Sequence, residues 1–222
     1  MKLALFDLDH TLLPLDSDFS WGQFTVDLGW RDAVTHTQTN EAFYAQYCAG
    51  TLNIADHVRF STEALREQGM PAAHAAHERF MRDVIRPAIR PVALDLVAQY
   101  RQAGYATLLV TATNAFVTRP IAEAFGMDEL IAIDLAVDAS GTPTGEIHGT
   151  PSFREGKVAR VEQWLSERSL SWADVKHSVF YSDSMNDLPL LERVHEPVAT
   201  NPDARLLDIA TQRGWRILNL FE

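Results

Sequence analysis

The chain has 222 residues, of which 46% are hydrophobic, and its formal net charge at pH 7 is −11. This length allows one domain with a large insertion, while the acidic balance disfavours nucleic acid or an anionic membrane surface as a partner, since both need a basic footprint. The single cysteine, Cys48, excludes an intramolecular disulfide framework and a cysteine-rich zinc site. No apolar run reaches membrane-spanning length and the N-terminus does not resemble a signal peptide, so we expect a cytoplasmic protein with no membrane partner.

A short and largely apolar segment, residues 1–6, opens the chain and is predicted to form a buried strand. It ends in Asp7 and Asp9, which flank one apolar residue. Acids at the tip of a buried strand are costly unless a cation is bound there. In open α/β sheets, ligands bind in the crevice outside the carboxyl ends of the strands. We therefore expect a cation and a ligand at this end of the first strand.

Residues 16–86 are predicted to form helix after helix, because no strand-like run interrupts them. Asn53 is the expected N-cap of one helix, and Pro71 is placed well in the first turn of another. Pro87 and Pro91 stiffen the connection that leads back from this region. The predicted division is a helical cap at 16–86 and a catalytic core made of 1–15 and 87–222.

Strands and helices alternate through the rest of the chain. Strands are expected at 105–110, 130–137, 178–181, 196–200 and 215–218, and helices at 92–103, 114–125, 155–168, 187–192 and 203–212. A short hairpin arm is expected at 145–148. This alternation predicts a Rossmannoid, doubly wound α/β fold: a mostly parallel sheet with helices on both faces and the helical cap inserted after the first strand.

Polar residues follow three of the predicted strands, namely Asp7, Thr111 and Asp183. Parallel strands point their carboxyl ends the same way, so these side chains are expected to converge on one crevice. Lys157 cannot balance the carboxylates that gather with it, which are Asp7, Asp9, Asp183 and Asp187. Two like unit charges about 4 Å apart repel by roughly 4 kcal/mol at an effective dielectric of about 20. A divalent cation is therefore implied, and ligand oxygens alone point to Mg²⁺.

The same residue types suit phosphate chemistry. A hydroxyl such as that of Thr111 and an ammonium such as that of Lys157 are expected partners of phosphate oxygens. A carboxylate can act as a nucleophile and form an aspartyl-phosphate. A second carboxylate two residues later can protonate the leaving alcohol and then activate water.

Four segments resemble the signatures of the haloacid dehalogenase-like (HAD) hydrolases, in order along nearly the whole chain. Asp7-Leu8-Asp9-His10-Thr11-Leu12 is similar to the first signature, and Leu108-Leu109-Val110-Thr111 to the second. Gly156-Lys157 is similar to the third, and Tyr181-Ser182-Asp183-Ser184-Met185-Asn186-Asp187 to the fourth. The helical insertion resembles the C1-type cap of the phosphoserine phosphatase-like branch.

This resemblance implies a Mg²⁺-dependent phosphatase that hydrolyses a small phosphorylated metabolite through an aspartyl-phosphate. It implies that Asp7 is the nucleophile, that Asp9 is the acid and base, and that Thr111 and Lys157 bind phosphate. The implied metal ligands are Asp7, the backbone carbonyl of Asp9 and Asp183, with Asp187 supporting a metal-bound water or Lys157.

The substrate candidates follow from departures from the phosphoserine phosphatase pattern. Asp16 occupies the place of the glutamate that binds the substrate amine there, although a local turn or capping role is also open to it. The expected carboxylate-binding arginine falls at Ser61, and the nearby Arg59 is a substitute. Thr113 and Asn114 replace residues that follow the second-signature hydroxyl. The substrate is expected to resemble either phosphoserine or histidinol phosphate, which has an amine and no carboxylate.

Two alternatives from other classes use similar residues. A phospho-aspartate receiver-type signalling domain also places Asp, Thr, Lys and Mg²⁺ around a phosphorylated aspartate, but it lacks a helical insertion and an acid at position 9. A dehalogenase is the second alternative, and it typically lacks the acid at position 9 as well.

Overall fold

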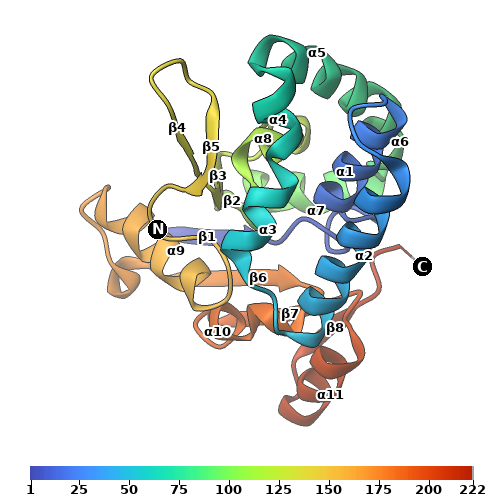
Figure 1. The fold of residues 1–222 in the computed structure, drawn as a ribbon. Helices are drawn as coiled ribbons and strands as arrows, with labels where there is room; N and C mark the ends of the chain where they lie inside the picture. Colours follow the sequence, from blue (N-terminus) through green and yellow to red (C-terminus); the bar gives the residue numbers. More distant parts are fainter. Residues whose placement is uncertain (222) are drawn as a thin grey trace.

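A six-stranded parallel sheet forms the centre of the molecule. The computed structural model describes residues 1–221 and gives the strand order β3-β2-β1-β6-β7-β8, with every neighbouring pair parallel (Figure 1). The strands are β1 Lys2–Phe6, β2 Ala106–Asn114, β3 Glu129–Ile133, β6 His177–Ser182, β7 Glu196–Thr200 and β8 Arg216–Leu218. The order runs outward in both directions from β1, so the topological switch point lies beside this strand. The predicted doubly wound α/β fold is confirmed.

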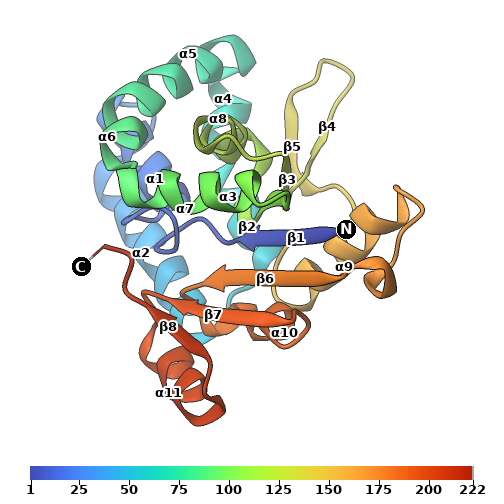
Figure 2. The ribbon, with the colours of Figure 1, turned by 180° about the vertical axis from the view of Figure 1, so that it is seen from behind.

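Helices cover both faces of this sheet because its strands alternate their side chains between two apolar clusters. Ala4 and Phe6 pack in one cluster with helices α7 and α8, and Leu3 and Leu5 pack in the other with α9, α10 and α11. Figure 2 shows α7 crossing the face of the sheet that is turned to the viewer. The bounds are α7 Pro91–Gln102, α8 Ala115–Phe125, α9 Glu155–Ser166, α10 Leu188–Leu191 and α11 Ala204–Arg213.

The segment between β1 and α7 is helical, as predicted. Its helices are α1 Ser17–Asp27, α2 Ala33–Ala49, α3 Ile54–Ser61, α4 Glu63–Gln68, α5 Met70–Phe80 and α6 Arg86–Ala88, with a π-helical turn at Met81–Ile85. Asn53 caps α3 by accepting from the backbone N–H groups of Ala55 and Asp56, and Pro71 lies in the first turn of α5. Pro87 lies within α6, so the chain leaves the helical conformation only at Ile89.

This helical segment is called the cap below, and the rest of the chain is called the core. The cap contacts the core in two different ways. On one side, Trp21 and Phe80 of the cap belong to the same buried apolar cluster as Phe6 and Ile121 of the core. On the other side, core side chains bind the carbonyl end of α2, where backbone C=O groups lack helical partners. Asn186 Nδ2 donates to the Tyr47 carbonyl at 3.0 Å, and Arg154 and Arg205 donate to the carbonyls of Gly50 and Cys48.

An antiparallel hairpin, β4 Leu135–Val137 with β5 Pro143–Ile147, projects beside the cap (Figure 1). The strand expected at 130–137 is therefore two strands, since the chain leaves the main sheet at Asp134, whose carboxylate binds Arg160 at 2.7 Å. Two 3-10 turns, Trp172–Asp174 and Met185–Asp187, complete the elements, and the second begins the helical segment expected at 187–192. In the described residues 1–221, no helix is long and apolar enough to cross a membrane.

Candidate active site

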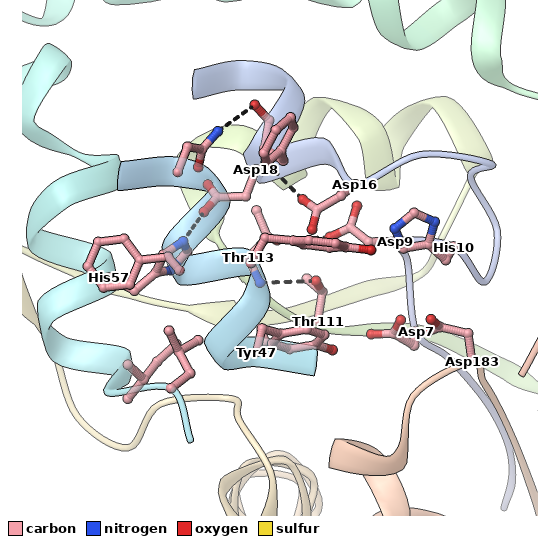
Figure 3. Close-up of a pocket in the computed structure, with 17 residues that line it drawn as sticks. Asp7, Asp9, His10, Asp16, Asp18, Tyr47, His57, Thr111, Thr113 and Asp183 are labelled. Atoms are coloured by element: carbon pink, nitrogen blue, oxygen red, sulfur yellow. Dashed lines mark hydrogen bonds and ion pairs between the residues drawn. The ribbon is translucent and has the colours of Figure 1, made fainter. Parts of the chain in front are cut away.

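The strand register brings the carboxyl-terminal parts of three strands, β1, β2 and β6, to one point. Phe6 of β1 is aligned with Leu109 of β2 and with Tyr181 of β6. Asp7 directly follows β1 and Asp183 directly follows β6, whereas Thr111 lies within β2, two residues beyond Leu109. All three line one cavity between the sheet and the cap (Figure 3). The three side chains therefore lie at one cavity, although β2 continues past Thr111 to Asn114.

The turn after β1 adds Thr11 to this constellation. The Leu8 carbonyl accepts from the backbone N–H groups of Thr11, Leu12 and Leu13, which curls the chain back beneath the strand tip. The Thr11 hydroxyl lies 3.2 Å from Asp7 Oδ2 and 3.2 Å from Asp183 Oδ1, and it accepts from the Asp183 N–H at 3.0 Å. Thr11 therefore fixes the spacing between the two carboxylates.

Lys157 is buried between two carboxylates at the start of α9. Its Nζ lies 2.7 Å from Asp7 Oδ1 and 2.7 Å from Asp187 Oδ2. Burial opposes its charge, but the two carboxylates outweigh this effect and hold the pKa of Lys157 above its ordinary value. The preceding residue must be glycine, because a Cβ at Gly156 would lie 2.0 Å from the Pro151 carbonyl oxygen.

The acids at the carboxyl ends of the strands carry more negative charge than Lys157 offsets. Burial, reinforced by the charge of Asp7, raises the pKa of Asp183 well above its ordinary value. Burial also raises the pKa of Asp7, although Lys157 opposes the shift. In the described part of the chain, no three His, Cys, Asp or Glu side chains form a metal-ligand group by themselves. The carboxylates of Asp7 and Asp183 and the backbone carbonyl of Asp9 still suit Mg²⁺, because this ion keeps several waters and binds substrate phosphate oxygens.

Asp9 lies beside this group and is held by two donors. Its Oδ1 accepts from the Ser17 N–H at 2.7 Å, and its Oδ2 accepts from the Thr113 hydroxyl at 2.9 Å. Burial, together with the charge of Asp16, raises the pKa of Asp9 to about 7. A carboxyl group with this pKa can exchange a proton near neutral pH.

The cap supplies the far end of the cavity. Asp16 caps α1 by accepting from the Phe19 N–H at 2.8 Å, and its side chain also lines the cavity. Asp18 Oδ2 lies 3.3 Å from Nε2 of His57 (Figure 3). Burial raises the pKa of Asp18 to about 7 and lowers that of His57 to about 4, so at neutral pH this contact joins a neutral imidazole to an acid that is only partly ionised.

Four of the predicted site residues do not line the cavity, and one of them, Lys157, is buried behind Asp7, whose Oδ1 it contacts. Arg59 is half-exposed on α3 and pairs with Asp56 at 3.2 Å and with Glu146 of the hairpin at 3.0 Å. Asn114 caps α8 and donates from Nδ2 to Asp18 Oδ1 at 3.4 Å, which places it behind the wall. Asp187 contacts Lys157 and Ser182 and does not line the cavity.

Sequence reasoning missed several residues at the site. Thr11 was inside the first signature but had no assigned role, and Asp18 and His57 were not singled out. Asp18 follows Asp16 by two residues, which is a local signal for a second acid at the same helix start. His57 carried no such signal, because only the packing of α3 against α1 brings it to Asp18.

The fold and this arrangement of Asp, Thr and Lys at the sheet edge define a hydrolase of the HAD class. The family model for haloacid dehalogenase-like hydrolases matches residues 4–192. The chain belongs to this family, and the expectation of an enzyme with a HAD-like fold is confirmed.

The similar proteins include named phosphatases and solved structures. A histidinol-phosphatase of Neisseria meningitidis serogroup C (strain 8013) is 41% identical over 218 residues, which is 98% of both chains. The crystal structure of a protein of unknown function from Bordetella pertussis Tohama I is 48% identical, with a TM-score of 0.93 over 99% of each chain. A substrate-bound phosphoserine phosphatase has a TM-score of 0.68 at 19% identity, covering 98% of this chain and 92% of that one, and it shows the shared fold alone.

Proposed function

We propose that this protein is a Mg²⁺-dependent phosphatase that hydrolyses a small phosphomonoester through an aspartyl-phosphate on Asp7. Asp7 lines the cavity at the tip of β1, and Lys157 and Thr11 hold its two oxygens. In this mechanism Asp7 attacks the phosphorus atom in line with the leaving alcohol. Thr111 and Lys157 bind the phosphate oxygens.

Asp9 serves as the acid and then as the base. Its pKa of about 7 leaves a substantial protonated fraction at neutral pH, and the Ser17 N–H and the Thr113 hydroxyl orient its oxygens. The protonated carboxyl donates to the departing alkoxide while Asp7 is phosphorylated. The resulting carboxylate takes a proton from the water that hydrolyses the phospho-aspartate.

Asp7, Asp183 and the backbone carbonyl of Asp9 would hold the metal. The raised pKa values of Asp7 and Asp183 support this assignment. Among the described residues, Lys157 is the one cationic side chain beside this pair, and it contacts Asp7. When bound, Mg²⁺ offsets the negative charge that the phosphate brings to these acids.

The substrate that the cavity favours carries an ammonium group and no carboxylate. The titratable groups that line the cavity are five aspartates, two histidines and two tyrosines, and no arginine or lysine of residues 1–221 lines it. A substrate carboxylate would have no cationic partner there, and Arg59 is engaged by Glu146 outside the cavity. Asp16, by contrast, offers an acceptor for an ammonium. This choice agrees with the name of the histidinol-phosphatase relative, and we propose histidinol phosphate rather than phosphoserine.

The test is phosphate release from histidinol phosphate and from phosphoserine in the presence of Mg²⁺. We expect histidinol phosphate to be the better substrate, and we expect Asp7→Asn to lower its turnover at least a thousandfold, because the amide is no nucleophile. Asp95→Asn, a change at an exposed position of α7, is the matched control. Mass spectrometry of the acid-quenched wild-type enzyme should find the phosphoryl group on Asp7. Retained turnover in Asp7→Asn would falsify the assignment.

A further inference from the structure

We propose that Asp18 and His57 form a second recognition subsite, at the cap end of the cavity, for a flat nitrogen-containing ring of the substrate. The ring class is a five-membered heteroaromatic with an N–H donor, such as imidazole. This inference rests on the proposed function, because it concerns the part of the substrate that does not react.

Asp18 and His57 lie at the end of the cavity opposite the residues that are proposed to react. Asp18 is in the first turn of α1 and His57 is in α3, whereas Asp7 and Asp183 lie at the other end of the same cavity (Figure 3). Asp16 lies between the two ends in this view. A substrate with its phosphate on Asp7 and its amine at Asp16 therefore extends its remaining group toward Asp18.

The carboxylate of Asp18 has acceptor positions that no protein donor occupies. Asn114 donates to its Oδ1 from outside the cavity, and His57 Nε2 lies next to its Oδ2. A carboxylate has about four acceptor positions, so a ligand N–H can still bind Asp18. Asp18 is 8% exposed and has no arginine or lysine partner among the described residues, so a cationic or N–H-bearing ring supplies the partner that its carboxylate lacks.

An aromatic side chain gives this end of the cavity a flat apolar wall. Phe43 lines this end, and its ring lies 5.3 Å from that of His57, edge to face. Tyr44 lines the cavity nearer His10, with ring centroids 6.4 Å apart. Phe19 packs against Tyr44 with ring centroids 6.0 Å apart. The flat ring of Phe43, combined with the polar pair of Asp18 and His57, favours a flat polar ring over an aliphatic chain.

A purely structural role for Asp18 is the competing explanation. An acid in the first turn of a helix interacts favourably with the helix dipole, and the contact with His57 ties α1 to α3. Such a role predicts equal effects of an Asp18 substitution on all substrates. A ring subsite predicts an effect that depends on whether the substrate has the ring.

The experiment compares two phosphate esters of 2-amino alcohols, histidinol phosphate and 2-aminopropyl phosphate, which has no ring. We expect Asp18→Asn to lower the ratio of their kcat/KM values at least tenfold, because the amide replaces a carboxylate acceptor. Asp16→Asn should lower both kcat/KM values and leave the ratio within about threefold of wild type. Asp56→Asn, at an exposed position of α3, is the matched control that leaves both values unchanged.

A binding measurement makes the test independent of turnover. Calorimetry with the products histidinol and 2-aminopropanol should show tighter binding of histidinol to wild type, and this preference should be lost in Asp18→Asn. An unchanged preference in a folded Asp18→Asn protein overturns the ring subsite and leaves the phosphatase standing. Absence of phosphate release from both esters by wild type, with the histidinol preference present, overturns the proposed function and supports the subsite.

Discussion

The ammonium group of Lys157 lies 2.7 Å from Oδ2 of Asp187, and the same carboxylate oxygen accepts from the Ser182 hydroxyl at 2.8 Å. Asp187 therefore holds Lys157 from the side that faces away from the cavity. Of the two supporting roles that the resemblance implied, the geometry favours the one toward Lys157. We propose that Asp187 is a positioning residue.

Asp187→Asn should reduce both activity and stability. The amide cannot offset the charge of Lys157, which then depends on Asp7 alone. Removing one partner of a buried ion pair typically costs about 3 kcal/mol, and we expect a loss of this size in the free energy of unfolding measured in urea. We also expect kcat to fall at least tenfold, whereas Asp208→Asn at an exposed position of α11 should change neither quantity. Wild-type kcat in Asp187→Asn would contradict the positioning role.

Mg²⁺ should raise the melting temperature of the wild-type protein. A ligand that binds only the folded state stabilises it by about 2.7 kcal/mol at a concentration one hundred times its dissociation constant. We expect Asp183→Asn to abolish most of this rise, because one of the two proposed carboxylate ligands is gone. Scanning calorimetry with and without a chelator measures the effect. The same rise in wild type and variant would argue against Asp183 as a ligand.

The stability of the metal-free protein should depend on pH through Asp18. Its pKa is about 7 in the folded protein because of burial, against 3.8 ordinarily, so unfolding between these values releases a proton. The contribution of Asp18 to the free energy of unfolding consequently falls as pH rises through this window, by at most about 1.4 kcal/mol per pH unit. Asp18→Asn lacks this contribution, so its stability relative to wild type should increase from pH 5 to pH 8 in urea titrations. A difference that stays constant over this range would count against the burial of an ionisable Asp18.

Phe80→Ala should destabilise the whole protein rather than the cap alone. Phe80 is fully buried in the apolar cluster that also contains Phe6 of the sheet. Truncating a buried phenylalanine costs about 3–5 kcal/mol. We expect one unfolding transition at a lower temperature, observed identically by near-UV and far-UV circular dichroism. Two separated transitions would show that the cap unfolds independently.

The sequence allowed this end of the sheet to be predicted because its key residues follow apolar runs, although β2 itself continues past Thr111. Asp7, Thr111 and Asp183 each follow an apolar run, and parallel pairing alone then brings them together. The cap was harder to predict, because helical periodicity does not say how helices pack on one another. Arg59 lies on the side of α3 that faces the hairpin, and pairing with Glu146 depends on a hairpin that begins after the break at Asp134. No local pattern indicated that break.

The apolar cluster that runs without interruption from the sheet into the cap has a consequence for how this enzyme can diversify. Leu8 and Leu12 of the core belong to the same buried cluster as Trp21 and Phe80 of the cap, so removal of the cap would expose the interior of the core as well as its catalytic cavity. Under the proposed ring subsite, exchange of Asp18 or His57 changes specificity without disturbing this cluster, which contains neither residue. Loss of the whole insertion is not a route open to this enzyme.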